Sequence, residues 1–133
     1  MTVRLATAED GYKIAALLKL NGWGAEIGEL DWRDLGPYWL VADGKDRLAA
    51  CVQLCWSKPI ARVEMMAFDP DLTKQERGRL TRDLAYAAMR TIALDGIQAV
   101  MFVVPFDLQS YKRLLKRRGA VTVHSGNVLF KRL

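Results

Sequence analysis

The stretch FDPDLTKQERGRLTRDL, residues 68–84, begins at the end of a predicted strand. It contains a glycine, Gly78, among basic residues. Gly78 could belong to a phosphate-binding loop, because free N–H groups and the helix dipole favour anions at a helix N-terminus. The same stretch contains a capping box, Thr73-x-x-Glu76, which is typical of an ordinary helix start. The basic neighbours that would favour a bound phosphate are Lys74, Arg77, Arg79 and Arg82.

Cysteine and histidine are few, with two and one in the chain. Cys51 and Cys55 fall in CVQLC, a predicted strand, where they share one face at a separation of roughly 13 Å. That is too far for a disulfide between them, and two thiols alone do not form a zinc site. We therefore expect buried small side chains and no metal. His124 is the single histidine, and we interpret it as a hairpin residue.

Positive charge is concentrated towards the C-terminus. The chain has a formal net charge of +5, yet no acidic residue follows Asp107. Such asymmetry attracts polyanions, including nucleic acid, an anionic membrane or a phosphorylated cofactor, although a solvated helix face explains it equally well. Only Tyr111 interleaves with the cluster and no nucleic-acid motif is present, so we do not expect nucleic acid as the partner. The basic residues of the tail are Lys112, Arg113, Lys116, Arg117, Arg118, Lys131 and Arg132.

The elements that must position these residues follow from apolar periodicity and turn signals. Their predicted order is β-α-(α)-β-β-β-α-β-α-β-β, ending in a hairpin at Ser125-Gly126-Asn127. Three successive strands with short turns imply an antiparallel meander, and the strand–helix–strand segment 61–104 implies a parallel pair with a right-handed crossover. We predict a mixed α/β fold with a six- to seven-stranded sheet and helices on both faces. The predicted strands up to the last helix are 2–6, 38–43, 47–57, 61–68 and 97–104.

The chain of 133 residues is 51 % hydrophobic, so we expect one domain over residues 1–133 with its own core. No run of about eighteen apolar residues occurs, so no transmembrane helix is expected. The opening MTVRLATAED lacks the pattern of a signal peptide. These features lead us to expect a cytoplasmic protein with no membrane partner.

The order of elements resembles the GCN5-related N-acetyltransferase (GNAT) superfamily over essentially the whole chain. VRLATAEDGYKIAALLKLNG is similar to that family's first strand and helix, GIQAVMFVVP to its fifth strand and YKRLLKRRGAV to its last helix. VEMMAFDP resembles the fourth strand, which reads as an apolar residue followed by Leu-x-Val-x-Pro. The residues at those places are Val63, Met66, Phe68 and Pro70.

The resemblance implies that acyl-CoA lies in a gap between the fourth and fifth strands, bonded to backbone groups of Met66, Ala67 and Phe68. It also implies a pyrophosphate loop of pattern Arg/Gln-x-x-Gly-x-Gly/Ala, which QERGRL fits except for its last residue. A glycine inside a helix costs about 1 kcal/mol relative to alanine, so we predict this loop rather than a capped helix. The residues expected to line it are Gln75, Arg77, Gly78, Arg79 and Leu80.

The resemblance also implies catalytic groups. Glu64 stands where many family members have a carboxylate, which would take the proton from an attacking amine. An ion pair with a neighbouring Arg or Lys explains Glu64 equally well. Leu115 occupies the place of the family's tyrosine acid, and Tyr111, one turn earlier, either substitutes for it or packs. Strand alternation predicts that one face is shared by Arg62, Glu64, Met66 and Phe68.

The resemblance therefore implies an acyl-CoA-dependent N-acetyltransferase that uses acetyl-CoA as co-substrate and no metal. Direct attack would move the acetyl group to an unidentified small-molecule or protein amine. The alternative is a catalytically inactive GNAT-fold binding or structural module that uses the basic C-terminal region. A homodimer is a further expectation, because small members of this fold often pair through strand edges.

Overall fold

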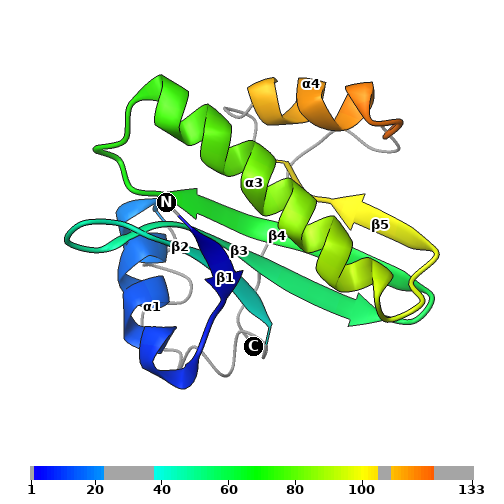
Figure 1. The fold of residues 1–133 in the computed structure, drawn as a ribbon, viewed down its shortest axis with the longest axis horizontal. Helices are drawn as coiled ribbons and strands as arrows, with labels where there is room; N and C mark the ends of the chain where they lie inside the picture. The colour runs from blue at the N-terminus through cyan, green and yellow to red at the C-terminus, as the bar shows by residue number, and fades with distance from the viewer. Residues whose placement is uncertain (1, 23–37, 105–108, 122–133) are drawn as a thin grey trace.

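The computed structural model describes residues 2–22, 38–104 and 109–121 and is drawn in Figure 1. Its described strands form one sheet in the order β1-β2-β3-β4-β5. Neighbouring strands are antiparallel except for β4 and β5, which are parallel, so the predicted mixed sheet is confirmed. The predicted C-terminal hairpin and the short helix within 23–36 lie outside the described residues. The strands are β1 (Val3–Leu5), β2 (Trp39–Asp43), β3 (Leu48–Ser57), β4 (Ile60–Phe68) and β5 (Ala99–Phe102).

Helices cover both faces of the sheet, as predicted. Helix α3 (Lys74–Ala93) crosses one face with α4 (Gln109–Arg117) beside it, and α1 (Gly11–Leu20) packs on the other face after the short helix η1 (Ala8–Asp10) (Figure 1). Thr7 precedes η1, and its backbone N–H donates to Asp10 Oδ2 at 2.8 Å. Within the described part of the chain, no helix has the length and apolar character needed to cross a bilayer.

Two apolar layers hold the helices against the sheet. The layer under α3 and α4 includes Leu80, Leu84 and Ile92 of α3 and Tyr111 and Leu115 of α4. The layer under α1 is smaller and contains Ile14, Leu17, Leu18, Trp39, Val41, Leu48, Cys51 and Ala67. These sets follow the helical periodicity of the sequence, so burial of the apolar stripes drives the layering.

Strand β4 carries one residue more than β3 across a short stretch. Glu64 pairs with Gln53 and Ala67 pairs with Cys51, so three steps along β4 match two steps along β3. This β-bulge leaves an extra residue in β4 and reverses which face the following side chains occupy. Val63 and Met66 consequently lie in the same layer under α3, whereas regular alternation would have separated them.

The prediction that Arg62, Glu64, Met66 and Phe68 share one face is therefore wrong. Met66 and Phe68 belong to the layer under α3. Glu64 lies opposite Gln53, and Gln53 alternates along β3 with Cys51, which belongs to the layer under α1. The bulge between Glu64 and Ala67 is the physical reason, because one extra residue shifts a period of two by one step.

Candidate active site

The pairing between β4 and β5 ends halfway along β4. The last paired residues are Val63 and Phe102, and one further bond joins Val103 N–H to Val63 O at 3.0 Å. β4 nevertheless continues to Phe68, and no described strand pairs with the edge of Glu64–Phe68 that faces away from β3. An unpaired sheet edge presents backbone donors and acceptors that a ligand of extended shape can satisfy.

Backbone alternation decides which residues direct their groups to this open edge. Asp69 N–H, directly after β4, donates to Ala49 O on β3 at 2.8 Å. Successive residues of a strand turn their N–H and C=O groups to opposite neighbours, so Ala67 faces β3 while Met66 and Phe68 face the open edge. Of the three residues predicted to hold acyl-CoA through their backbone, two are oriented for that role.

The backbone of Phe68 already has a partner. Asn21, directly after α1, donates from Nδ2 to Phe68 O at 2.9 Å, and its Oδ1 accepts from Phe68 N–H at 3.4 Å. The same Nδ2 donates to Leu17 O at 2.8 Å, which ties the amide to the end of α1. Of the two oriented residues, Met66 is the one whose backbone has no such contact with any part of the chain that the structure describes.

Glu64 lies beside the point where the two strands separate. Its side chain is half-buried, and Cys55 Sγ lies 3.8 Å from its Oε1, within reach of a weak S–H donor. Gln53, the residue opposite Glu64, is buried at 5 % exposure. A half-buried carboxylate at this place has the chemistry to accept a proton from an amine.

Helix α3 begins with the capping box and not with an open loop. Thr73 N–H donates to Glu76 Oε1 and Glu76 N–H donates to Thr73 Oγ1, both at 3.1 Å. The predicted phosphate loop is therefore wrong in its geometry. The residues assigned to it, which all lie within the helix, are Gln75, Arg77, Gly78, Arg79 and Leu80.

Helix α3 forms here, in place of the predicted loop, because several small free-energy contributions outweigh the cost of Gly78. A glycine in a helix costs about 1 kcal/mol, but the capping bonds contribute a similar amount. Leu80, at 1 % exposure, adds the burial of a large apolar side chain, which is worth roughly 1.5–3 kcal/mol. When the chain is helical through Gly78, Leu80 points into the apolar layer between α3 and the sheet.

The start of α3 still offers groups that favour an anion. Among the described residues, the N–H groups of Lys74 and Gln75 in the first turn have no side-chain cap, and the helix dipole points its positive end there. Arg77 lies with its guanidinium carbon 5.8 Å from the centre of the Phe68 ring, and its buried Nε has no partner within residues 2–22, 38–104 and 109–121. Arg77 therefore connects the helix start to the end of the open edge.

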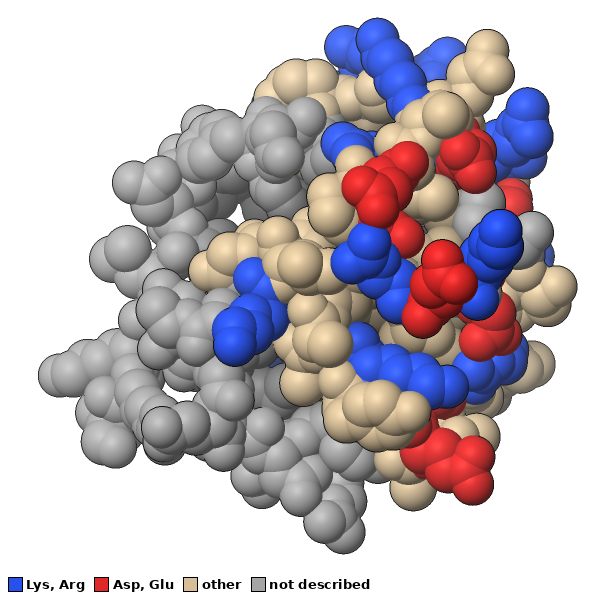
Figure 2. All heavy atoms as spheres, turned by 90° about the vertical axis from the view of Figure 1, so that its left-hand side faces the viewer, with Lys and Arg blue, Asp and Glu red and all other residues tan. Residues whose placement is uncertain are grey.

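Negative charge also gathers near this helix start. Arg47, from the turn between β2 and β3, contacts Asp69 Oδ2 at 3.2 Å and Asp71 Oδ2 at 2.8 Å. Hydrogen bonds from Thr73 hold the pKa of Glu76 below its ordinary value. Figure 2, which looks at the left-hand side of Figure 1, accordingly shows acidic and basic side chains interleaved rather than a uniform basic patch.

Comparison with solved structures identifies the fold. One solved structure similar to this chain is the ribosomal-protein-alanine N-acetyltransferase of Brucella melitensis biovar Abortus 2308. Its TM-score is 0.73, with 14 % sequence identity, and the match covers 98 % of this chain and 100 % of that one. Another is the aminoglycoside N-acetyltransferase AAC(6')-Iy in complex with CoA. Its TM-score is 0.66, with 14 % sequence identity, and the match covers 99 % of this chain and 100 % of that one. The chain has the GNAT fold.

A third GNAT-fold structure is Rv2747 of Mycobacterium tuberculosis in complex with CoA and NLQ. It has a TM-score of 0.66 and 19 % identity over 86 % of this chain and 70 % of that one. No protein-family model matches this sequence, and no curated protein matches it either. The likeness of this chain to GNAT-fold proteins therefore lies in its three-dimensional structure.

The side chain of Tyr111 is packed in the apolar core. Its side chain is 1 % exposed, and its ring meets Phe102 edge to face with centroids 6.2 Å apart. Its hydroxyl is buried without a partner among the described residues, and burial raises its pKa. Tyr111 belongs to the layer under α3, on the opposite face of the sheet from Glu64, so the structure does not bring these two predicted catalytic residues together.

Sequence reasoning missed Asn21 and the contact of Cys55 with Glu64. The pair Asn21-Gly22 reads as a helix end, which it is, but nothing local indicates a partner 47 residues away. Cys55 was expected to be a buried small side chain and is half-buried beside a carboxylate. The described residues contain no cluster of three or more His, Cys, Asp and Glu side chains suited to a metal ion.

Proposed function

We propose that this chain is an acyl-CoA-dependent N-acetyltransferase. The observation that carries the proposal is the early end of the β4–β5 pairing, which leaves backbone groups of a long strand unpaired beside a half-buried carboxylate. GNAT-fold structures that resemble this chain are complexes with CoA, which supports a thioester of CoA as the acyl donor. The amine acceptor is a small molecule or a protein.

Different residues would bind different parts of acyl-CoA. The backbone of Met66 would bond an amide of the pantetheine arm, as a neighbouring strand would. Arg77 and the N–H groups of Lys74 and Gln75 would hold its pyrophosphate through charge-assisted hydrogen bonds. Arg77 would lie between the two parts of the donor, because its guanidinium is over the Phe68 ring at the end of the open edge.

The chemical step that we assign to this site is direct attack. The amine nitrogen forms a bond to the thioester carbonyl carbon, the C–S bond breaks, and the sulfur leaves as a thiolate. Glu64 accepts the proton that the nitrogen loses, either directly or through one water. We assign no acid to the thiolate, because Tyr111 lies on the other face of the sheet.

Calorimetric titration of acetyl-CoA into the purified protein, at low and moderate salt, tests the proposal. We expect one-to-one binding that survives moderate salt, followed by release of CoA thiol when a panel of primary amines is added. A fragment that carries the acetylated pantetheine arm without phosphates is the matched probe, because it reports on the β4 edge alone.

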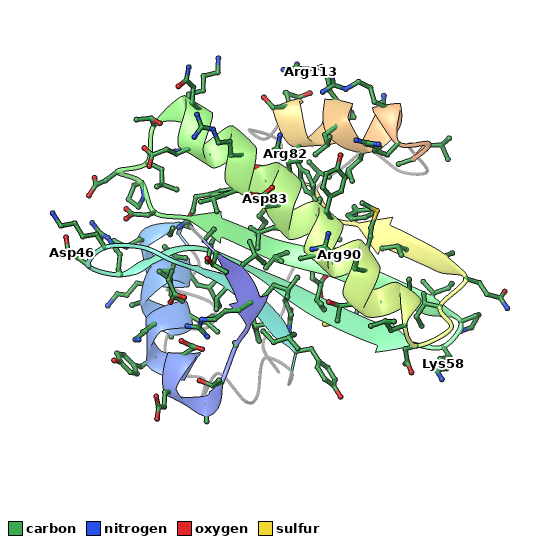
Figure 3. The ribbon with its side chains drawn as sticks, in the orientation of Figure 1. Asp46, Lys58, Arg82, Asp83, Arg90 and Arg113 are labelled. Carbon is green, nitrogen blue, oxygen red and sulfur yellow. The ribbon has the colours of Figure 1, made fainter. Side chains whose placement is uncertain are left out.

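Absence of heat and of thermal stabilisation with both probes would contradict the proposal. The chain would then be a GNAT-fold module without turnover, and its basic helix α4 would be the surface to examine. Figure 3 shows Arg113 on the outer side of that helix. The end of α4 is tied to α3, since Arg118 lies over the Tyr86 ring at 5.1 Å and bonds its hydroxyl.

A further inference from the structure

The contact between Asn21 and Phe68 joins two parts of the molecule that otherwise belong to different layers. Asn21 follows the last residue of α1, whereas Phe68 ends β4. One carboxamide satisfies both the N–H and the C=O of Phe68, on the edge that β5 leaves unpaired. A primary amide therefore stands in the position that a neighbouring strand, or an amide-containing ligand, would take.

We propose that Asn21 is an exchangeable occupant of the donor site, which acyl-CoA must displace from Phe68 before it binds along the whole open edge. The inference rests on the proposed function. The pantetheine arm contains two secondary amides, each with an N–H donor and a C=O acceptor, which match what Asn21 now supplies. Asn21 is thus a residue that sets the affinity for the donor without touching the reacting atoms.

The distances indicate how the exchange proceeds. The bond from Phe68 N–H to Asn21 Oδ1 is long, at 3.4 Å, so its loss costs little. Nδ2 has two hydrogens, and the bond to Leu17 O at 2.8 Å retains one of them when Phe68 is released. The displaced amide therefore keeps a partner at the end of α1, while Phe68 exchanges one amide for another.

The direction of a mutational effect separates this role from a structural one. Damage to the end of α1 would weaken donor binding, whereas removal of a competing amide strengthens it. Asn21→Ala removes the side-chain donor and acceptor, and the backbone bonds of Asn21 to Leu17 and Leu18 remain available. Asn21→Ser is the second variant, because its hydroxyl is too short to reach Phe68. Gln98→Ala, which removes an exposed amide before β5, is the matched control.

The experiment is calorimetric titration of acetyl-CoA into the wild type and the three variants, after thermal melting shows that each is folded. We expect Asn21→Ala and Asn21→Ser to bind about three- to tenfold more tightly, which is the effect of removing one or two competing hydrogen bonds, and Gln98→Ala to match the wild type. If the two Asn21 variants bind acetyl-CoA and the wild type does not, this would also support the proposal, because Asn21 would then block the site in the wild type.

Equal or weaker binding by folded Asn21 variants, with normal binding by the wild type, would overturn the inference and leave the proposed function in place. Failure of all four proteins to bind acetyl-CoA would overturn both. A second readout is the side-chain amide resonance pair of Asn21 in an NMR spectrum. It should shift on addition of the acetylated pantetheine fragment, and an unchanged pair at saturation would contradict displacement.

Discussion

The open edge of β4 and the start of α3 are adjacent in the chain, but they retain the features of a donor site to different degrees. The edge depends on backbone groups and on where strand pairing stops, so its polar groups do not come from the side chains of residues 64–68. The helix start also depends on backbone groups, but here the capping box of Thr73 and Glu76 uses two of the N–H groups that an anion would need. The two regions therefore differ in what occupies their polar groups, which is Asn21 at the edge and the capping box at the helix start.

Under the proposed function, the edge would bind the pantetheine arm of acetyl-CoA and the helix start would bind its pyrophosphate. Arg77 links the two regions, because it lies in the first turns of α3 and its guanidinium faces the Phe68 ring at the end of β4. Separate probes for the two parts of the donor therefore measure the two regions independently. The following variants change one region at a time.

The largest effect is expected at the edge, from Glu64→Gln. The variant cannot accept the amine proton, so turnover should fall about 10²–10⁴-fold while the affinity for acetyl-CoA stays within about twofold. The measurement is the initial rate of CoA thiol release with the best amine of the panel. Glu9→Gln, at an exposed carboxylate of η1, is the control. An unchanged rate would remove Glu64 from the mechanism.

The next effect is expected at the helix start, from Arg77→Ala. Loss of a charge-assisted bond to the pyrophosphate should weaken acetyl-CoA binding about tenfold or more, whereas the phosphate-free fragment should bind as before. Calorimetry with both probes checks this. Arg90→Ala is the matched control, because this exposed arginine lies near the other end of α3 (Figure 3). Equal losses for both probes would mean that Arg77 supports the edge rather than the phosphates.

A smaller effect of opposite sign is expected from Glu76→Gln. Glutamine can keep the capping box, so helix α3 should remain intact, while the loss of a negative charge should tighten acetyl-CoA binding about two- to threefold at low salt and less at high salt. Weaker binding would show that the carboxylate itself orders the anion site.

The same variant has a pH signature. The pKa of Glu76 lies below its ordinary value of 4.5, so its charged form contributes stability above pH 4.5 that is lost as the pH falls through the lowered pKa. Urea denaturation at a series of acidic pH values should therefore give a shallower decrease for Glu76→Gln than for the wild type. Parallel decreases would show that the capping bond adds no stability.

The smallest effect on binding is expected from Gly78→Ala. A Cβ atom at Gly78 would meet nothing within 4 Å, and the position lies inside α3. The free energy of unfolding should rise by about 0.5–1 kcal/mol, with acetyl-CoA affinity within about twofold. Urea denaturation and calorimetry measure the two quantities. A large loss of affinity would mean that the helix start opens into a loop when the donor binds.

The elements were predictable because each has a strong local signal. Leu80, Leu84 and Ile92 recur at helical spacing, alternation of apolar and polar residues marks β1, and a short apolar run followed by a turn marks β2. The bulge was not predictable, since β4 is apolar from Met65 to Phe68 and shows no period there that an extra residue would break. Local rules also gave two answers for residues 73–78, and the decision came from burial of Leu80, which only the tertiary structure reveals.

The candidate site was predictable to the extent that it resides in one segment. Glu64 and Met66 follow from the fourth-strand motif, and the structure places both at or beside the open edge. The partner of Phe68 was not predictable, because a single asparagine after a helix carries no information about a strand 47 residues away. The same is true of Tyr111, whose burial depends on how α4 packs against Phe102.

The extra residue in β4 also matters to anyone who redesigns this protein. Positions 60–64 and 66–68 behave as two short strands of opposite phase, although they look continuous in the sequence. A library that alternates polar and apolar residues through the whole of β4 would place charges in the layer under α3 and produce mostly unfolded variants. A library that restarts its alternation at position 66 would avoid this.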